Sequence, residues 1–169
     1  NVPTQDAVQG IIDREFFLPT ANKVAHRELK SEAEKLVTKY IKDFGDELRR
    51  VWMTERPFEL HLDGVTVSGR ADVILDGQPG NEGRLTIVDY KTAAAQEEKH
   101  ELQLQIYLDA GRREGLDVAD AFVHDMKSAD RIPVDSSESA IKAAEDMVRR
   151  SAASLKKKDY KPNPERGRC

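Results

Sequence analysis

Residues 85–91 read Leu-Thr-Ile-Val-Asp-Tyr-Lys. The other predicted elements are arranged around this stretch. Its apolar and β-branched residues favour a buried strand, whereas its charged residues gather at the end. Because side chains alternate along a strand, Asp89 and Lys91 point to the same face as Ile87. Burying either charge alone is costly, so the pattern predicts that each needs the other, a metal ion or water.

The residues before this strand predict a β-hairpin. Phe58, Leu60 and Leu62 alternate with polar residues, and the alternation resumes over residues 65–75. Asp63-Gly64, between the two runs, is a typical turn signal. A glycine-rich loop over residues 77–83 then leads into the strand at 85–90. Together these three strands predict an antiparallel meander.

A helix and another strand are predicted after the meander, over residues 99–113 and 120–126. A helix between two strands permits the second strand to return parallel to the first. We therefore expect an α/β domain with a central mixed sheet flanked by helices.

Helical periodicity precedes the hairpin. An apolar stripe at spacings of three and four runs from Leu29 to Trp52, which predicts one long helix over residues 24–52. A shorter helix that contains Val8 and Ile12 precedes it and is expected to end near Pro19.

The last helix is predicted over residues 136–158, opened by a capping box of Asp135 and Glu138. We expect one domain over residues 1–169, as a fragment of a longer chain. It comprises a helical part over 1–52, a core over 55–130, the last helix, and a tail over 159–169.

Charge and composition exclude several classes of protein. The net charge is −4, but residues 150–169 carry +5 and residues 1–149 carry −9, which rules out a uniformly basic coat for nucleic acid. The sequence contains no apolar run long enough for a membrane span and no signal-peptide pattern, so we expect no membrane partner. A single cysteine excludes an internal disulfide framework and favours a reducing, cytoplasmic location. The four histidines lack zinc-finger spacing.

Asp72 supplies a second carboxylate beside Asp89. It shares the even-numbered face of its strand with Arg70 and Ile74, so it can meet a carboxylate at the end of the neighbouring strand. Two carboxylates suit a hard cation such as Mg²⁺, and Lys91 could then orient water and stabilise developing negative charge. On spacing alone, an ordinary Asp–Lys ion pair, with Asp72 at a turn or edge, is an equally good interpretation.

Three motifs, taken in order, favour the metal site over the ordinary ion pair. They are Gly-Arg-Ala-Asp-Val-Ile at 69–74, Ile-Val-Asp-Tyr-Lys-Thr at 87–92, and Gln-Leu-Gln-Ile-Tyr at 103–107. They resemble the RecB-like branch of the PD-(D/E)XK nucleases, whose pattern is G-x-x-D, D-Y-K-T and Q-x-x-x-Y. Residues 55–60 are also similar to the strand that precedes the first aspartate in that family. The resemblance spans roughly residues 29–130 and implies a restriction-endonuclease-like core.

The resemblance also implies roles for particular residues. Asp72 and Asp89 would bind Mg²⁺ or Mn²⁺, the backbone carbonyl of Tyr90 would complete the protein ligands, and Lys91 would assist the attacking water. Members that are active usually place a further metal-binding histidine on an upstream helix. His26 is the candidate upstream of the sheet, although a surface histidine fits its position better. We expect the histidine of the motif to precede Asn1 or to be absent.

Gln103 and Tyr107 lie one helical turn apart on one face. The resemblance implies that they hydrogen-bond the site or the DNA strand, whereas a buried tyrosine with a satisfied hydroxyl group is the alternative.

The basic tail offers weaker candidates. Lys156, Lys157, Lys158 and Lys161 could contact a DNA backbone, although a solvated helix end explains them equally well. The approach to Cys169 resembles that of relatives with an iron–sulfur cluster, but one cysteine cannot hold a cluster. Such a cluster is therefore expected only in a longer parent protein.

The resemblance implies a metal-dependent nuclease that hydrolyses DNA phosphodiester bonds, as an exonuclease rather than an endonuclease. A helicase domain or subunit of the UvrD superfamily would be its partner in recombination, DNA end processing and double-strand break repair. The alternative is a catalytically inactive nuclease-like module that binds DNA or protein partners in a helicase–nuclease complex. A small-molecule phosphatase or another Mg²⁺ enzyme has only the carboxylates in its favour.

Overall fold

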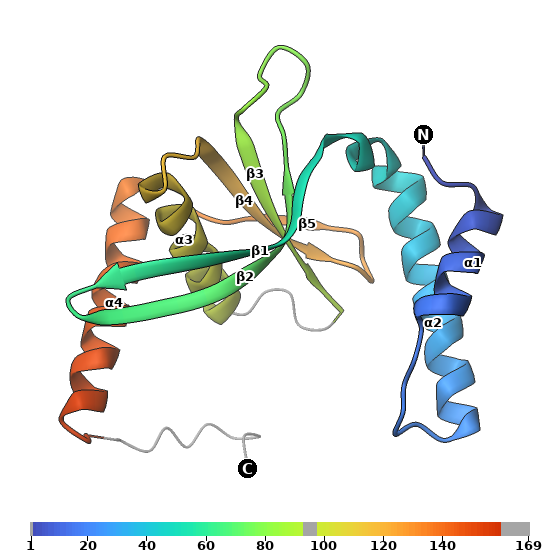
Figure 1. Cartoon of the computed structure of the whole chain (residues 1–169), viewed down its shortest axis with the longest axis horizontal. Helices are drawn as coiled ribbons and strands as arrows, with labels where there is room; N and C mark the ends of the chain where they lie inside the picture. The colour runs from blue at the N-terminus through green and yellow to red at the C-terminus, as the bar shows by residue number, and fades with distance from the viewer. Residues whose placement is uncertain (1, 93–97, 160–169) are drawn as a thin grey trace.

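A five-stranded sheet forms the centre of the computed structural model, which describes residues 2–92 and 98–159 (Figure 1). Helices α1 and α2 lie on one side of the sheet, and α3 and α4 lie on the other. In chain order the elements are α1 (Gln5–Glu15), α2 (Lys23–Phe44), the 3₁₀ helix η1 (Gly45–Arg50), β1 (Val51–Leu62), β2 (Val65–Leu75), β3 (Leu85–Lys91), α3 (Glu98–Arg113), β4 (Val118–Asp125), β5 (Arg131–Pro133) and α4 (Glu138–Lys156).

The strands lie in the order β1-β2-β3-β4-β5, and the sheet is mixed. β3 and β4 are parallel, whereas the pairs β1–β2, β2–β3 and β4–β5 are antiparallel. Helix α3 is the crossover that returns the chain to the start of the parallel pair. The predicted α/β fold with a mixed sheet flanked by helices is therefore confirmed.

The hairpin turn lies where the sequence predicts it. Leu62 pairs with Val65, and both residues between them have positive φ, 47° for Asp63 and 76° for Gly64. Such a two-residue turn matches the twist of the strands that it joins. β1 and β2 form the long hairpin that extends across the front of Figure 1.

The predicted long helix is wrong at its end. α2 stops at Phe44, η1 follows, and β1 begins at Val51, so Leu48 and Trp52 do not extend the helical stripe. Leu48 and Trp52 are 38% and 40% exposed, and the chain here pairs with β2 through Val51 and Leu75 instead. Leu48 thus lies in η1, and strand formation overrides the helical spacing at Trp52.

Three smaller elements also differ from the sequence expectation. α1 ends at Glu15, before the predicted end near Pro19. α4 is capped by Ser137, whose side chain accepts a hydrogen bond from the Ala140 N–H, rather than by a capping box that starts at Asp135. No sequence pattern predicts β5, because a three-residue strand carries no periodic signal.

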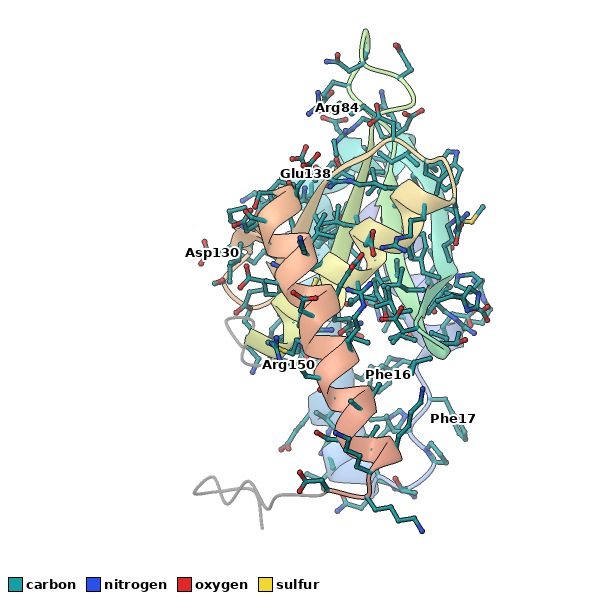
Figure 2. All side chains as sticks on the ribbon, turned by 90° about the vertical axis from the view of Figure 1, so that its left-hand side faces the viewer. Phe16, Phe17, Arg84, Asp130, Glu138 and Arg150 are labelled. Carbon is teal, nitrogen blue, oxygen red and sulfur yellow. The ribbon has the colours of Figure 1, made fainter. Side chains whose placement is uncertain are left out.

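Apolar side chains fill both sides of the sheet. The larger core lies between the sheet and α3 and α4, and it includes Phe58, Leu60, Ile74, Ile87, Leu104, Leu108, Val123 and Ile141. On the opposite side, Tyr40 and Phe44 of α2 pack against Tyr90 and His124. Figure 2 shows α4 toward the viewer, with Glu138 and Arg150 labelled along it. No helix in the described part of the chain has both the length and the apolar character needed to cross a membrane.

Candidate metal centre

β2 and β3 separate at the level of Asp72. Their ladder runs from Leu75–Thr86 to Val73–Val88 and stops there, although Asp72 and Asp89 would form the next pair. In place of a backbone bond, Oδ2 of Asp72 accepts a hydrogen bond of 2.8 Å from the N–H of Tyr90. We call Asp72, Asp89, Tyr90 and Lys91 the β2–β3 junction.

The backbone of the hairpin is irregular at this position. Ala71 and Ile74 both face the larger core, so strict alternation along β2 is interrupted between them, at Asp72 and Val73. On β1, Glu55 lies between the pairs Thr54–Val73 and Arg56–Ala71, opposite Asp72, and has a φ of 53°. The predicted regular alternation over residues 65–75 is therefore wrong at the position that carries the candidate ligand.

Asp89 is a buried charge with a single cationic neighbour among the described residues. It is 1% exposed, and Nζ of Lys91 lies 2.5 Å from its Oδ2. The same Oδ2 accepts no aligned hydrogen bond from any described residue. Because a carboxylate has several acceptor positions, one ammonium group leaves Asp89 with unused capacity for a ligand.

The surroundings of Asp72 disfavour its ionised form. Burial is the main cause that raises the pKa of Asp72, and the negative charges of Asp89 and Glu55 raise it further. The Tyr90 N–H and the Lys91 ammonium lower the pKa and partly oppose this effect. With two carboxylates and one ammonium, the junction carries a net charge of −1, which a cation would relieve.

The donor atoms of the junction fit a hard divalent cation. The Lys91 carbonyl accepts a hydrogen bond from the Met126 N–H on the β4 side. Successive carbonyls of a strand point to opposite edges, so the Tyr90 carbonyl points toward β2, as its N–H does. Two carboxylates and this carbonyl are all oxygen ligands, the type that Mg²⁺ prefers.

Within residues 2–92 and 98–159, no group of three His, Cys, Asp or Glu side chains is arranged so that it could hold a metal ion. The junction thus offers an incomplete protein shell. Mg²⁺ commonly keeps several water ligands, so an incomplete shell is compatible with this ion.

Gln103 and Tyr107 connect α3 to β2. The Tyr107 hydroxyl group accepts hydrogen bonds from the backbone N–H of Arg70 at 3.0 Å and from Nε2 of Gln103 at 2.9 Å. Arg70 lies on the part of β2 that has separated from β3, so Tyr107 satisfies a backbone donor that the sheet no longer pairs. Tyr107 is 6% exposed, which places it as a support of β2 two residues from Asp72.

Gly69 allows this close approach of helix and strand. A Cβ atom at Gly69 would lie 2.2 Å from the Tyr107 hydroxyl oxygen. Any larger residue would therefore push α3 and β2 apart beside the junction.

Glu55 is a neighbour of the junction that no sequence pattern marked as a site residue. Its carboxylate lies 3.6 Å from Nη1 of Arg70, and both side chains are 65% exposed. The motif over residues 55–60 located its strand. Its place opposite Asp72, however, depends on a register that only the folded sheet defines.

The structure does not bring His26 to the junction. His26 lies fourteen residues before Tyr40 on α2, a separation of about 21 Å along a helix axis, whereas Tyr40 contacts Tyr90 directly. The His26 ring packs edge-on against Phe16 at 5.3 Å. Its position is that of a packing residue between α2 and the chain that precedes it.

The lysines at the end of α4 also lie far from the junction. Nζ of Lys156 is 3.9 Å from the position that a Cβ would take on Gly64, at the tip of the hairpin. This tip is about 26 Å from Asp72 at the rise of a strand. Lys157 and Lys158 follow at the exposed end of α4, and Lys161 and Cys169 lie outside the described residues.

Comparison with known proteins gives a family and a fold. A family model described as the PD-(D/E)XK nuclease superfamily matches residues 3–169. Among solved structures, a protein from Eubacterium rectale named as a putative exonuclease is similar over 98% of this chain and 68% of its own, with 14% sequence identity and a TM-score of 0.57. The structure of SSO0001 matches over 92% of this chain and 86% of its own, with 13% identity and a TM-score of 0.46. No curated protein matches the chain.

Proposed function

Because this chain belongs to the PD-(D/E)XK nuclease superfamily, we propose that the β2–β3 junction is the catalytic centre of a metal-dependent deoxyribonuclease. The observation that carries the proposal is the juxtaposition of Asp72 and the buried, incompletely satisfied Asp89 with the ammonium group of Lys91. An ordinary ion pair would need only one carboxylate. The second carboxylate, whose pKa is raised beside the first, supports a site built for a cation.

Each residue has a distinct task in this proposal. Asp72, Asp89 and the Tyr90 carbonyl would hold Mg²⁺ or Mn²⁺. When bound, such an ion supplies Lewis-acid polarisation of a phosphodiester and lowers the pKa of water. Lys91 donates hydrogen bonds to the attacking water or to the phosphate oxygen on which negative charge develops. Hydrolysis forms a phosphorus–oxygen bond to the water oxygen and breaks the phosphorus–oxygen bond to the departing nucleotide oxygen, which overall receives the proton that the water loses.

Gln103 and Tyr107 act as positioning residues in this scheme. Their hydrogen bonds to each other and to the Arg70 N–H hold the middle of β2, and hence the backbone near Asp72, at its separation from β3. A direct contact of Tyr107 with DNA is not needed, because its hydroxyl group already accepts two hydrogen bonds inside the protein.

The order of the three motifs supports a RecB-like exonuclease that acts on DNA ends together with a helicase domain or subunit. In this role the exposed lysines at the end of α4 would contact the DNA backbone at a distance from the reacting phosphate.

A non-catalytic module is the second candidate function. One observation favours it: the described residues provide two carboxylates at the junction and no third ligating side chain, and His26 lies elsewhere. Such a module would bind DNA or a protein partner and would use Lys91 as one phosphate contact among several.

Cleavage and binding of linear DNA by matched variants distinguish the two candidates. Lys91→Met keeps the length of the side chain and removes its charge, and Lys142→Met does the same at an exposed position of α4. For an enzyme, we expect Lys91→Met to lower cleavage with Mg²⁺ by roughly 100-fold or more while metal-free binding is kept. Lys142→Met should cleave like the wild type.

Wild-type cleavage in the Lys91→Met variant would refute the catalytic role of Lys91. A wild-type protein that binds DNA and does not cleave it with either Mg²⁺ or Mn²⁺ would favour the non-catalytic module.

A further inference from the structure

We propose that Tyr40 of α2 is a positioning residue for the β2–β3 junction. Its hydroxyl group holds the Tyr90 side chain from the opposite face of the sheet, and this contact fixes the backbone between Asp89 and Lys91. The inference rests on the proposed function, because it assigns Tyr40 to the same metal site.

The contact between the two tyrosines is direct and partly buried. Their hydroxyl oxygens are 2.7 Å apart, and their rings meet edge to face at 5.4 Å with an interplanar angle of 90°. Tyr40 is 9% exposed, and it belongs to α2, which lies far from the junction along the sequence. Burial and the hydrogen bond with Tyr40 raise the pKa of Tyr90, so the phenol stays neutral.

β3 needs such a support at its end. Beyond Val88 it has lost its ladder to β2, whereas its pairing with β4 continues through Tyr90–His124 and Lys91–Asp125. A strand held by a backbone ladder along one edge resists rotation about its axis less than a strand that is paired along both edges. Because side chains alternate, a rotation at Tyr90 would move Asp89 and Lys91 on the opposite face.

Tyr40 is itself held in place, which a positioning residue requires. Its ring stacks on Phe44 at 5.6 Å and meets the edge of His124 at 5.3 Å. The guanidinium group of Arg131 lies 4.4 Å from the Phe44 ring centroid and forms an ion pair with Glu47. Side chains from α2, η1, β4 and β5 therefore form a connected cluster that includes the Tyr40 ring.

The test uses Tyr40→Phe, which removes one hydroxyl group and keeps the aromatic packing. Two quantities are measured with Mn²⁺ as the only ligand: the Mn²⁺ concentration that gives half of the maximal rise in Tm, and the hydrogen-exchange rate of the Tyr90 amide, which donates to Asp72. Ile12→Val is the matched control, because it loosens buried packing of α1 against α2 away from the junction. Tyr90→Phe removes the other half of the contact.

We expect Tyr40→Phe to raise the half-saturating Mn²⁺ concentration by roughly threefold to tenfold, the equivalent of one ordinary hydrogen bond. The Tyr90 amide should exchange faster relative to the Ile87 amide in the same strand. Tyr90→Phe should have the same effect, and the double variant should add little, because both changes break one bond. Ile12→Val should lower Tm without a change in either quantity.

The inference is refuted if Tyr40→Phe behaves like Ile12→Val, with a lower Tm but an unchanged Mn²⁺ response and unchanged relative exchange at Tyr90. If the wild-type protein shows no response to Mn²⁺, the proposed metal site fails and the inference fails with it. The two failures are thus distinguished by the behaviour of the wild type.

Discussion

Replacement of Tyr107 by phenylalanine tests how the helix supports the junction. The variant keeps the ring, which stacks on Phe58 at 5.7 Å, and removes only the hydroxyl oxygen. That oxygen accepts two hydrogen bonds, from the Arg70 N–H at 3.0 Å and from Gln103 Nε2 at 2.9 Å. This single substitution therefore leaves both donors without their acceptor.

The expected cost follows from the number and burial of these bonds. Tyr107 is 6% exposed, but the two hydrogen bonds are only partly buried, so water can reach the donors in part. Each ordinary hydrogen bond contributes about 1 kcal/mol, and an unsatisfied buried donor costs about 1–3 kcal/mol. We expect Tyr107→Phe to reduce the free energy of unfolding by about 2–3 kcal/mol. For a chain of this length, this corresponds to a fall in Tm of roughly 4–12 °C.

Thermal unfolding at pH 7 measures this effect, and Thr66→Val is the control. Thr66 and His61 form a hydrogen bond of similar length, 2.9 Å, on the exposed face of the hairpin. Its loss should change the free energy of unfolding by less than about 0.5 kcal/mol. If Tyr107→Phe costs no more than Thr66→Val, Tyr107 does not support β2, and the separation of β2 from β3 must have another cause.

Three further variants test the local electrostatics and packing. Asp72→Asn should raise Tm at pH 7, because the raised pKa of Asp72 means that its ionised form disfavours folding above that pKa. In melting curves recorded over a series of pH values, the rise in Tm over the wild type should vanish as the pH falls toward 3.8. A Tm below that of the wild type at pH 7 would contradict this prediction. Gly69→Ala should cost about 1–3 kcal/mol in denaturant unfolding, since its Cβ would overlap the Tyr107 ring; an unchanged midpoint would show that α3 yields without cost. Arg113→Met removes the cation 2.9 Å from Asp109 and should lower the free energy of unfolding at pH 7. This loss of stability should shrink toward pH 3.8, because Asp109, whose pKa is already raised, becomes protonated. If the loss of stability does not depend on pH, lost packing of the Arg113 side chain is its cause instead.

Much of the fold could be predicted because its signals are local. Alternation over Phe58, Leu60 and Leu62, followed by Asp63-Gly64, defines a hairpin without reference to the rest of the chain. The helix predicted after β3 permits a parallel β3–β4 pair, and the structure shows this parallel pairing. The common face of Asp89 and Lys91 follows from strand geometry alone, and the two groups do form an ion pair.

The remaining features depend on contacts between distant segments. Leu48 and Trp52 continue the helical spacing, but α2 has its C-cap at Gly45, and Trp52 lies in β1, which pairs with β2. The acceptor for the Arg70 N–H in β2 likewise comes from Tyr107, on a later helix. Tyr40 carries no sequence signal beyond its place in an apolar stripe, because its partner lies fifty residues away.

The most direct test of the metal centre is the anomalous diffraction of crystals soaked in millimolar Mn²⁺. We predict one Mn²⁺ ion at the β2–β3 junction, coordinated by the carboxylates of Asp72 and Asp89 and by the Tyr90 carbonyl at about 2.1–2.3 Å, with water in the remaining positions. Crystals of Asp89→Asn, soaked in the same way, should lack this ion. An empty junction in the wild-type crystals, or Mn²⁺ bound only at other carboxylates such as Asp109 and Glu145, would contradict the assignment of the metal centre to Asp72 and Asp89.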